Sequence, residues 1–164
     1  MEQLIQTLEL RLNNNRPRPM FTYASNGITI LALYDSGAVL PVWCMREDKF
    51  LNAYPEAEKL NIPCDVSGFG KGSVPCSVYR IPEFKLNDGN TSYLIFNLVL
   101  AVYENPKIGC DIVLSDTMFS KTNTVIQRIG DKALRIEFEK DGYYCTPMIN
   151  GKSIAITTWV QEGQ

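Results

Sequence analysis

The fold prediction starts from residues 28–43, whose sequence is ITILALYDSGAVLPVW. Residues 28–34 form an apolar, β-branched run that predicts a buried strand, and a second apolar run follows at 39–43. The residues between the two runs are Asp35, Ser36, Gly37 and Ala38. An ionised carboxylate between two core segments costs several kcal/mol unless it is paired or hydrogen bonded. Asp35 is therefore either a functional group or part of an ordinary turn, in which Asp, Ser and Gly are common.

The composition is typical of one globular domain. The chain has 164 residues, of which 45% are hydrophobic and 21% are charged, and this length is sufficient to bury a core. The net charge of −2 gives no electrostatic basis for binding nucleic acid or an anionic membrane. The N-terminus lacks a basic region followed by an apolar core, and no apolar run approaches the roughly 20 residues of a membrane span. We therefore expect neither a signal peptide nor a membrane segment.

Cysteine and histidine usage narrows the chemistry. The five cysteines are odd in number and include no Cys-x-x-Cys pair, so we expect reduced, mostly buried thiols in a cytoplasmic protein. The chain has no histidine, which excludes Ser-His-Asp and Cys-His catalysis and argues against a zinc site. If the protein is a hydrolase, carboxylates are the natural remaining acid and base.

The rest of the chain predicts many short strands and few helices. Strands are expected at 20–24, 78–86, 92–103, 108–115, 125–129, 134–139, 142–149 and 153–160. A hairpin turn is expected at Asn26-Gly27, between the strands over 20–24 and 28–34, and another turn at residues 87–90 (NDGN), between the strands over 78–86 and 92–103. An amphipathic helix is expected over 2–12, before a run of Asn and Pro that breaks it. A second helical segment is expected over 46–60, split by Pro55, with its charges on a solvated face. This pattern favours an all-β, β-dominated domain.

A glycine-rich segment lies between two β-forming stretches. Residues 66–74 contain Gly68, Phe69, Gly70 and Gly72, and this spacing predicts the tip of a flexible hairpin. A phosphate-binding loop is the rival interpretation. It fails because the segment fits neither GxxxxGK[ST] nor GxGxxG, and because the residues that follow it are strand-like rather than helical.

Four elements thus occur in one order: residues 33–38 (LYDSGA), a helical segment, a glycine-tipped hairpin, and residues 111–116 (DIVLSD) before a predicted short helix. This order resembles that of the retropepsin-like aspartic proteases, the family of retroviral proteases and their bacterial and cellular relatives. The resemblance covers roughly residues 20–139. It implies a closed β-barrel with a flap hairpin and a few short helices.

The resemblance also implies a division of the chain. A helix and an Asn/Pro-rich arm would occupy 1–19, a protease domain 20–140, and a C-terminal β extension 141–164. The two ends lie outside the shared part. They would act as propeptide-like segments, supply dimer strands, or bind a partner.

By the same resemblance, the chain is half of an enzyme that hydrolyses polypeptides as a homodimer without a metal or cofactor. Asp35 and its symmetry mate would share a proton, one acting as general base on a water and the other polarising the scissile carbonyl. Ser36 would hydrogen bond across the dimer, Gly37 would allow close backbone approach, and Ala38 would suit a crowded position. The remaining expected substrate-binding and flap residues are Gly68, Phe69, Gly70, Gly72, Val39, Leu40, Val113 and Ser115.

Ser115 departs from the family pattern, which usually has glycine there. A buried serine hydroxyl costs about 1–3 kcal/mol when it has no partner. Either this branch of the family tolerates the serine, or the activity is weak or lost. Two alternatives to a protease therefore stay open: a catalytically silent binding or scaffold protein on the same fold, and an unrelated β module in which Asp35 is exposed and unpaired in a turn.

Overall fold

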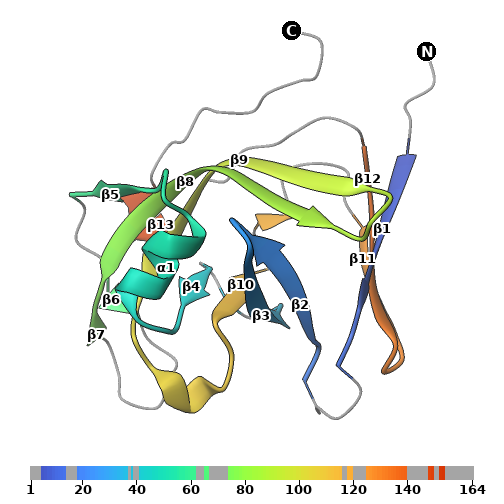
Figure 1. The fold of residues 1–164 in the computed structure, drawn as a ribbon, viewed down its shortest axis with the longest axis horizontal. Coiled ribbons are helices and arrows are strands. Elements are labelled where there is room, and N and C mark those ends of the chain that lie inside the picture. Colours follow the sequence, from blue (N-terminus) through green and yellow to red (C-terminus); the bar gives the residue numbers. More distant parts are fainter. Residues whose placement is uncertain are drawn as a thin grey trace, which may run out of the picture.

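The structure is a computed structural model that describes residues 5–13, 18–36, 38, 41–61, 65–66, 74–115, 118–119, 125–139, 148–149 and 152–153. Within these residues strands dominate and one α-helix is present, which confirms the predicted β-dominated fold class. The strands form one large sheet, one three-stranded sheet and two short hairpins (Figure 1). The closure of the large sheet into a barrel stays a prediction.

The large sheet has seven strands in the order β2-β3-β10-β4-β9-β8-β5. In that order they span Met20–Ser25, Ile28–Asp35, Ile112–Ser115, Val42–Trp43, Ser92–Val102, Ser77–Asn87 and Glu58–Leu60. Most neighbouring pairs are antiparallel, but β10 runs parallel to β3, and β4 runs parallel to β9. A late strand, β10, therefore lies between two strands from the first third of the chain. This topology brings the end of β10 beside the end of β3.

β2 and β3 form a hairpin whose turn is Asn26-Gly27. The φ angles of these two residues are 50° and 75°. Positive φ at both central residues defines a type I′ turn, which Asn-Gly favours and which matches the twist of the flanking strands. The pairing runs from Ser25↔Ile28 to Met20↔Leu33, so the turn fixes the register of the strand that ends at Asp35.

β8 and β9 form a long hairpin whose tip contacts the second sheet (Figure 1). In this tip, the Asp88 carboxylate accepts hydrogen bonds from the backbone N–H groups of Asn90 at 2.8 Å, Thr91 at 2.7 Å and Glu9 at 3.1 Å. Partial burial alone would raise the pKa of Asp88, but these N–H groups outweigh it and hold the pKa below its usual value. The contact with Glu9 connects the hairpin tip to β1.

The second sheet has the order β1-β12-β11, with bounds Ile5–Arg11, Ala133–Glu139 and Val125–Ile129. The helix predicted over 2–12 is therefore wrong. Leu8, Leu10 and Leu12 are buried at every second position, which is the period of a strand. β1 pairs with β12 along its whole length. The prediction used only the local spacing of apolar residues, which contains no information about a pairing strand more than a hundred residues away, and therefore did not identify β1 as a strand.

The single α-helix of the described residues, α1 (Glu47–Ala53), packs on the large sheet through aromatic contacts. Phe50 is fully buried, and its ring centroid lies 5.5 Å from that of Trp43 and 5.0 Å from that of Tyr79. The predicted helix over 46–60 is correct for this first half. After Pro55, which lies in a turn, the chain continues as β5 and pairs with β8.

Two further hairpins are short. β6 (Asp65–Val66) pairs with β7 (Val74–Pro75), and β13 (Met148–Ile149) pairs with β14 (Lys152–Ser153). A short 3-10 helix, η1 (Pro106–Ile108), precedes β10. No helix in the described part of the chain is long and apolar enough to cross a membrane.

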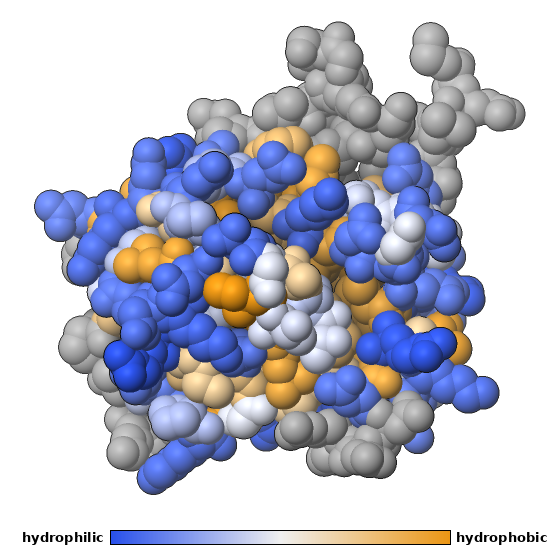
Figure 2. Space-filling view, in the orientation of Figure 1, coloured by the Kyte–Doolittle hydropathy of each residue, from blue (hydrophilic) through white to orange (hydrophobic). Residues whose placement is uncertain are grey.

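Hydrophilic side chains cover most of the face shown in Figure 2, with smaller hydrophobic areas between them. Of the described residues, the exposed large hydrophobic ones are Leu51 and Val125. The apolar residues are otherwise mostly buried in two clusters, one of which contains most of the aromatic side chains. The smaller cluster lies around β10 and β4 and adjoins the end of β3.

Candidate active site

Asp35 is the last residue of β3 and lies at the surface. Ile30, Ala32 and Leu33 upstream of it are buried, whereas Asp35 and Ser36 are exposed. The chain turns at this point, and the backbone N–H of Ala38 donates to the Asp35 carbonyl oxygen at 3.1 Å. β3, whose register is fixed by its hairpin with β2, thus ends in one exposed carboxylate. Asp35 also has an interaction partner in the structure.

The end of β10 lies directly beside Asp35. In the parallel register of the two strands, Ser115 is opposite Asp35, Leu114 is opposite Tyr34 and Val113 is opposite Leu33. All four residues of β10 are buried. The two motifs on which the sequence comparison depended, 80 positions apart in the chain, therefore meet at one edge of the sheet.

Ser115 is fully buried, at 0% exposure. Its hydroxyl is not among the buried polar atoms without a hydrogen-bond partner, and Ser115 does have an interaction partner. Ser115 therefore does not incur the free-energy cost of an unpaired buried hydroxyl, which was the argument against a serine at this position. Serine fits at this position in the fold.

The other predicted residues that the structure describes face the protein interior. Val113, expected as a pocket wall, is only 3% exposed and lies in the smaller hydrophobic cluster with Leu33 and Val42. Ala38 is half-buried and packs against the same cluster. These two side chains therefore support the end of β3 from within this chain.

A row of aromatic rings supports the same end of β3. The Phe119 ring lies 6.2 Å from Tyr34 and 5.4 Å from Tyr93, and Tyr93 makes an edge-on contact with Phe138 at 4.6 Å, all between centroids. Tyr34 immediately precedes Asp35, and Phe138 belongs to β12. Offset and edge-on ring pairs add about 0.5–1.5 kcal/mol each beyond their burial. This row joins the three-stranded sheet to the candidate site.

The residues of the expected flap tip lie outside the described residues. On either side of them, β6 and β7 pair antiparallel in the register Asp65↔Pro75 and Val66↔Val74. Seven predicted site residues lie outside the described residues, namely Gly37, Val39, Leu40, Gly68, Phe69, Gly70 and Gly72.

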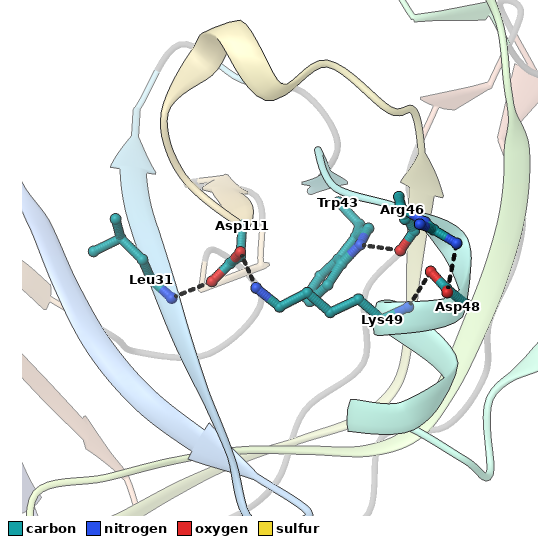
Figure 3. A network of polar contacts seen from close by, with 6 residues as sticks. All are labelled: Leu31, Trp43, Arg46, Asp48, Lys49 and Asp111. Atoms are coloured by element: carbon teal, nitrogen blue, oxygen red, sulfur yellow. Dashed lines mark hydrogen bonds and ion pairs between the residues drawn. The ribbon is translucent and has the colours of Figure 1, made fainter.

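A buried carboxylate, Asp111, lies close to the candidate site and was not predicted from the sequence. It is 6% exposed and forms an ion pair with Lys49 of α1, with Nζ 2.7 Å from Oδ1 (Figure 3). Its other oxygen, Oδ2, accepts the backbone N–H of Leu31 in β3 at 2.8 Å. The charges of residues 46–60 were expected on a solvated face. The Lys49 side chain is 42% exposed, but its ammonium group pairs with the buried Asp111, which the sequence did not predict. An acid directly before an apolar strand was the available signal, but its partner lies 62 positions away.

Two described cysteines, Cys44 and Cys110, are buried in the smaller hydrophobic cluster. The hydrogen bond of Cys44 with Cys110, together with burial, raises the pKa of the Cys44 thiol, so this sulfur stays protonated and is a poor nucleophile. Cys44 and Cys110 are both buried free thiols. Among the described residues, no group of three or more His, Cys, Asp or Glu side chains is placed to hold a metal ion.

Comparison with solved structures identifies a similar fold. A crystal structure of a retropepsin-like aspartic protease from Rickettsia conorii matches with a TM-score of 0.53 and covers 84% of this chain and 95% of that chain. The two sequences are 11% identical over the match, so the likeness is one of fold. It supports the retropepsin-like fold that the sequence predicted. No protein-family model matches the sequence, and no curated protein matches it in sequence.

Proposed function

We propose that two copies of this chain form an aspartic endopeptidase that hydrolyses extended polypeptides. The observation that supports this proposal most is the parallel pairing of β3 with β10. It sets an exposed Asp35, followed by Ser36, beside the end of a fully buried strand on a retropepsin-like fold. A carboxylate at such a strand end is accessible to a second subunit and to substrate.

The proposed reaction uses one Asp35 from each subunit. Two carboxylates about 3 Å apart do not both ionise easily, so the pair holds one proton. The ionised carboxylate takes a proton from a water, whose oxygen attacks the carbonyl carbon of the scissile bond. The protonated carboxyl of the other subunit donates a hydrogen bond to the carbonyl oxygen as negative charge develops on it. The tetrahedral intermediate then collapses: the scissile C–N bond breaks, and the proton taken from the water passes from the first carboxyl to the leaving amine nitrogen, which returns the pair to its one-proton state.

The remaining predicted residues have supporting roles in this proposal. Ser36 holds the turn across the dimer, and Gly37 permits close approach of the backbone to the substrate. The hairpin tip from Gly68 to Gly72, with Phe69, closes over the peptide and excludes water. Val39 and Leu40 line the substrate pocket, whereas the buried Val113 supports it from below.

The test is cleavage of a mixed library of fluorogenic peptides by the full-length chain. Asp35→Asn removes the ionisable group but preserves its shape, and we expect it to lower kcat/KM by about a thousandfold or more. Asp131→Asn is the matched control, because Asp131 lies in an exposed turn with its side chain 88% exposed. We expect the control to cleave at the wild-type rate. Equal rates in wild type and Asp35→Asn would refute the proposal.

A second candidate function is a catalytically silent binding or scaffold protein on the same fold. The presence of Ser115 where related proteases usually have glycine favours it. This candidate predicts no cleavage by the wild type at any pH from about 4 to 7. It also predicts a monomer in sedimentation at micromolar concentration.

A further inference from the structure

We propose that Asp111, together with Lys49, is a positioning residue that fixes the register between β10 and β3 and thereby places Ser115 opposite Asp35. The catalytic consequence of this inference rests on the proposed function, whereas the structural one does not. The sequence analysis assigned no role to either residue.

Asp111 uses every one of its polar groups to join separate elements. Its backbone N–H donates to the Leu31 carbonyl oxygen at 2.9 Å, and its carboxylate Oδ2 accepts the Leu31 N–H at 2.8 Å. Its carbonyl oxygen accepts the N–H of Cys44 at 2.8 Å, and Oδ1 accepts from Lys49 Nζ at 2.7 Å. Both backbone groups of one β3 residue are thus bound by one residue, and a shift of either strand would break both bonds.

The apolar pattern of β10 cannot fix this register by itself. In most sheets one face is polar, and a slip of one residue is prevented because it would expose the apolar side chains. Here all residues from Ile112 to Ser115 are buried, so both faces of β10 are covered and a slip meets no such penalty. The ladder between the strands is also only four pairs long. A slip of two residues would move Ser115 along β3 by about 7 Å.

The buried charge of Asp111 supplies the register specificity that the apolar pattern of β10 lacks. The best-attested use of a buried polar or ionic group is to select one register, because every other register leaves the group unpaired. Asp111 lies one position before the first pair of the ladder, and the Asp35–Ser115 pair is the last. The Asp111 contacts with Leu31 and Lys49, shown in Figure 3, therefore fix one end of a short ladder by charge. The candidate site lies at the other end.

Lys49 makes this contact possible. The Asp111 side chain is 8% exposed and that of Lys49 is 42% exposed, so the lysine brings its charge to the carboxylate from the surface along its apolar stem. The buried Phe50 and Ala53 hold α1, and with it Lys49, against the sheet. Without the ammonium group, the buried Asp111 carboxylate would have no ion-pair partner among the residues that the structure describes.

The experiment compares Lys49→Met with Lys49→Arg, which restores the charge, in the full-length protein. Lys59→Met is the control, because Lys59 is 62% exposed and its closest acid, Glu47, is 4.0 Å away. The two readouts are amide hydrogen exchange, followed by NMR, and peptide cleavage. In Lys49→Met, we expect the amide exchange of residues 112–115 to accelerate at least about tenfold, while exchange in β8 and β9 is unchanged. In the same variant, we expect kcat to fall about tenfold and KM to stay within about twofold of the wild-type value. Lys49→Arg is expected to restore both readouts, and Lys59→Met to match the wild type.

Unchanged exchange at residues 112–115 in Lys49→Met would overturn the inference, as would a uniform acceleration across all strands, which indicates a merely structural role. If Lys49→Met does not fold, Lys49→Gln serves in its place with the same expected pattern, because it retains a hydrogen-bond donor without the charge. If the wild type cleaves no peptide, the proposed function fails, but the exchange measurements still decide whether Asp111 fixes the register.

Discussion

The hydrogen bond between Tyr23 and Tyr54 gives a quantitative test of how α1 is held on the sheet. The two hydroxyl oxygens are 2.6 Å apart, and both residues are almost fully buried. Burial raises the pKa of Tyr23 well above its usual value. Burial also raises the pKa of Tyr54, where hydrogen bonds with Tyr23 and Ser25 offset part of the rise. Tyr54 therefore has a second polar neighbour in Ser25, whose hydroxyl donates to the Ala53 carbonyl oxygen at 2.7 Å and retains lone pairs that can accept from Tyr54.

This asymmetry predicts unequal costs for the two single substitutions. Tyr54→Phe leaves the buried Tyr23 hydroxyl without its partner, and we expect it to lower the free energy of unfolding by about 2 kcal/mol. In Tyr23→Phe the remaining Tyr54 hydroxyl keeps Ser25, and we expect a loss of about 1 kcal/mol. The double variant leaves no orphaned hydroxyl of the pair, so we expect it to cost less than the sum of the two singles, with a coupling of about 1 kcal/mol.

The assay is urea unfolding followed by far-UV circular dichroism at one fixed protein concentration, since a dimer makes apparent stability depend on concentration. Equal losses in the two single variants would contradict the role assigned to Ser25. Strict additivity in the double variant would show that the two hydroxyls do not interact.

Three further predictions concern the tip of the β8–β9 hairpin and the residues around the candidate site. The folded state lowers the pKa of Asp88, so the ionised carboxylate stabilises the fold fully above the carboxyl pKa of the unfolded chain, and this stabilisation is lost as pH falls through the pKa of the folded state. The difference in free energy of unfolding between wild type and Asp88→Asn should therefore narrow from about pH 6 to pH 2. A constant difference in urea titrations would contradict this. Ser115→Gly removes a buried hydroxyl that has a partner and gives the unfolded chain more backbone freedom. It should lower the free energy of unfolding by about 1–2 kcal/mol in the same assay. A stabilised variant would mean that the serine is strained. Phe119→Leu removes the ring contacts with Tyr34 and Tyr93 and should lower the free energy of unfolding by about 2 kcal/mol. It should also reduce cleavage, because Tyr34 immediately precedes Asp35. Cleavage at the wild-type rate would show that the aromatic row does not support the site.

The sequence alone predicted the elements whose signals are local. The apolar run of β3 and the Asn26-Gly27 turn were both identified correctly, because chain chemistry within a few residues determines them. The long hairpin of β8 and β9 was also predicted, since its strands are strongly apolar and its turn is rich in Asn, Asp and Gly. The order of these motifs was sufficient to suggest the fold.

The elements that were missed depend on partners far away in the chain. β1 is a strand because β12 pairs with it, and its three leucines at alternating positions also fitted a short helix. Lys49 resembles any lysine on a solvated helix until β10 brings Asp111 beside it. The placement of Ser115 opposite Asp35 follows from a parallel crossover of 80 positions, which only the resemblance to a family suggested.

The most direct test of the central claim is a subunit-mixing experiment with the wild type and Asp35→Asn. Equal amounts are mixed and allowed to exchange subunits, and peptide cleavage is measured at constant total protein. If each active site needs one Asp35 from each of two chains, random exchange leaves about a quarter of the wild-type activity. About half of the activity would remain if each chain worked alone, and that result would contradict the shared dyad.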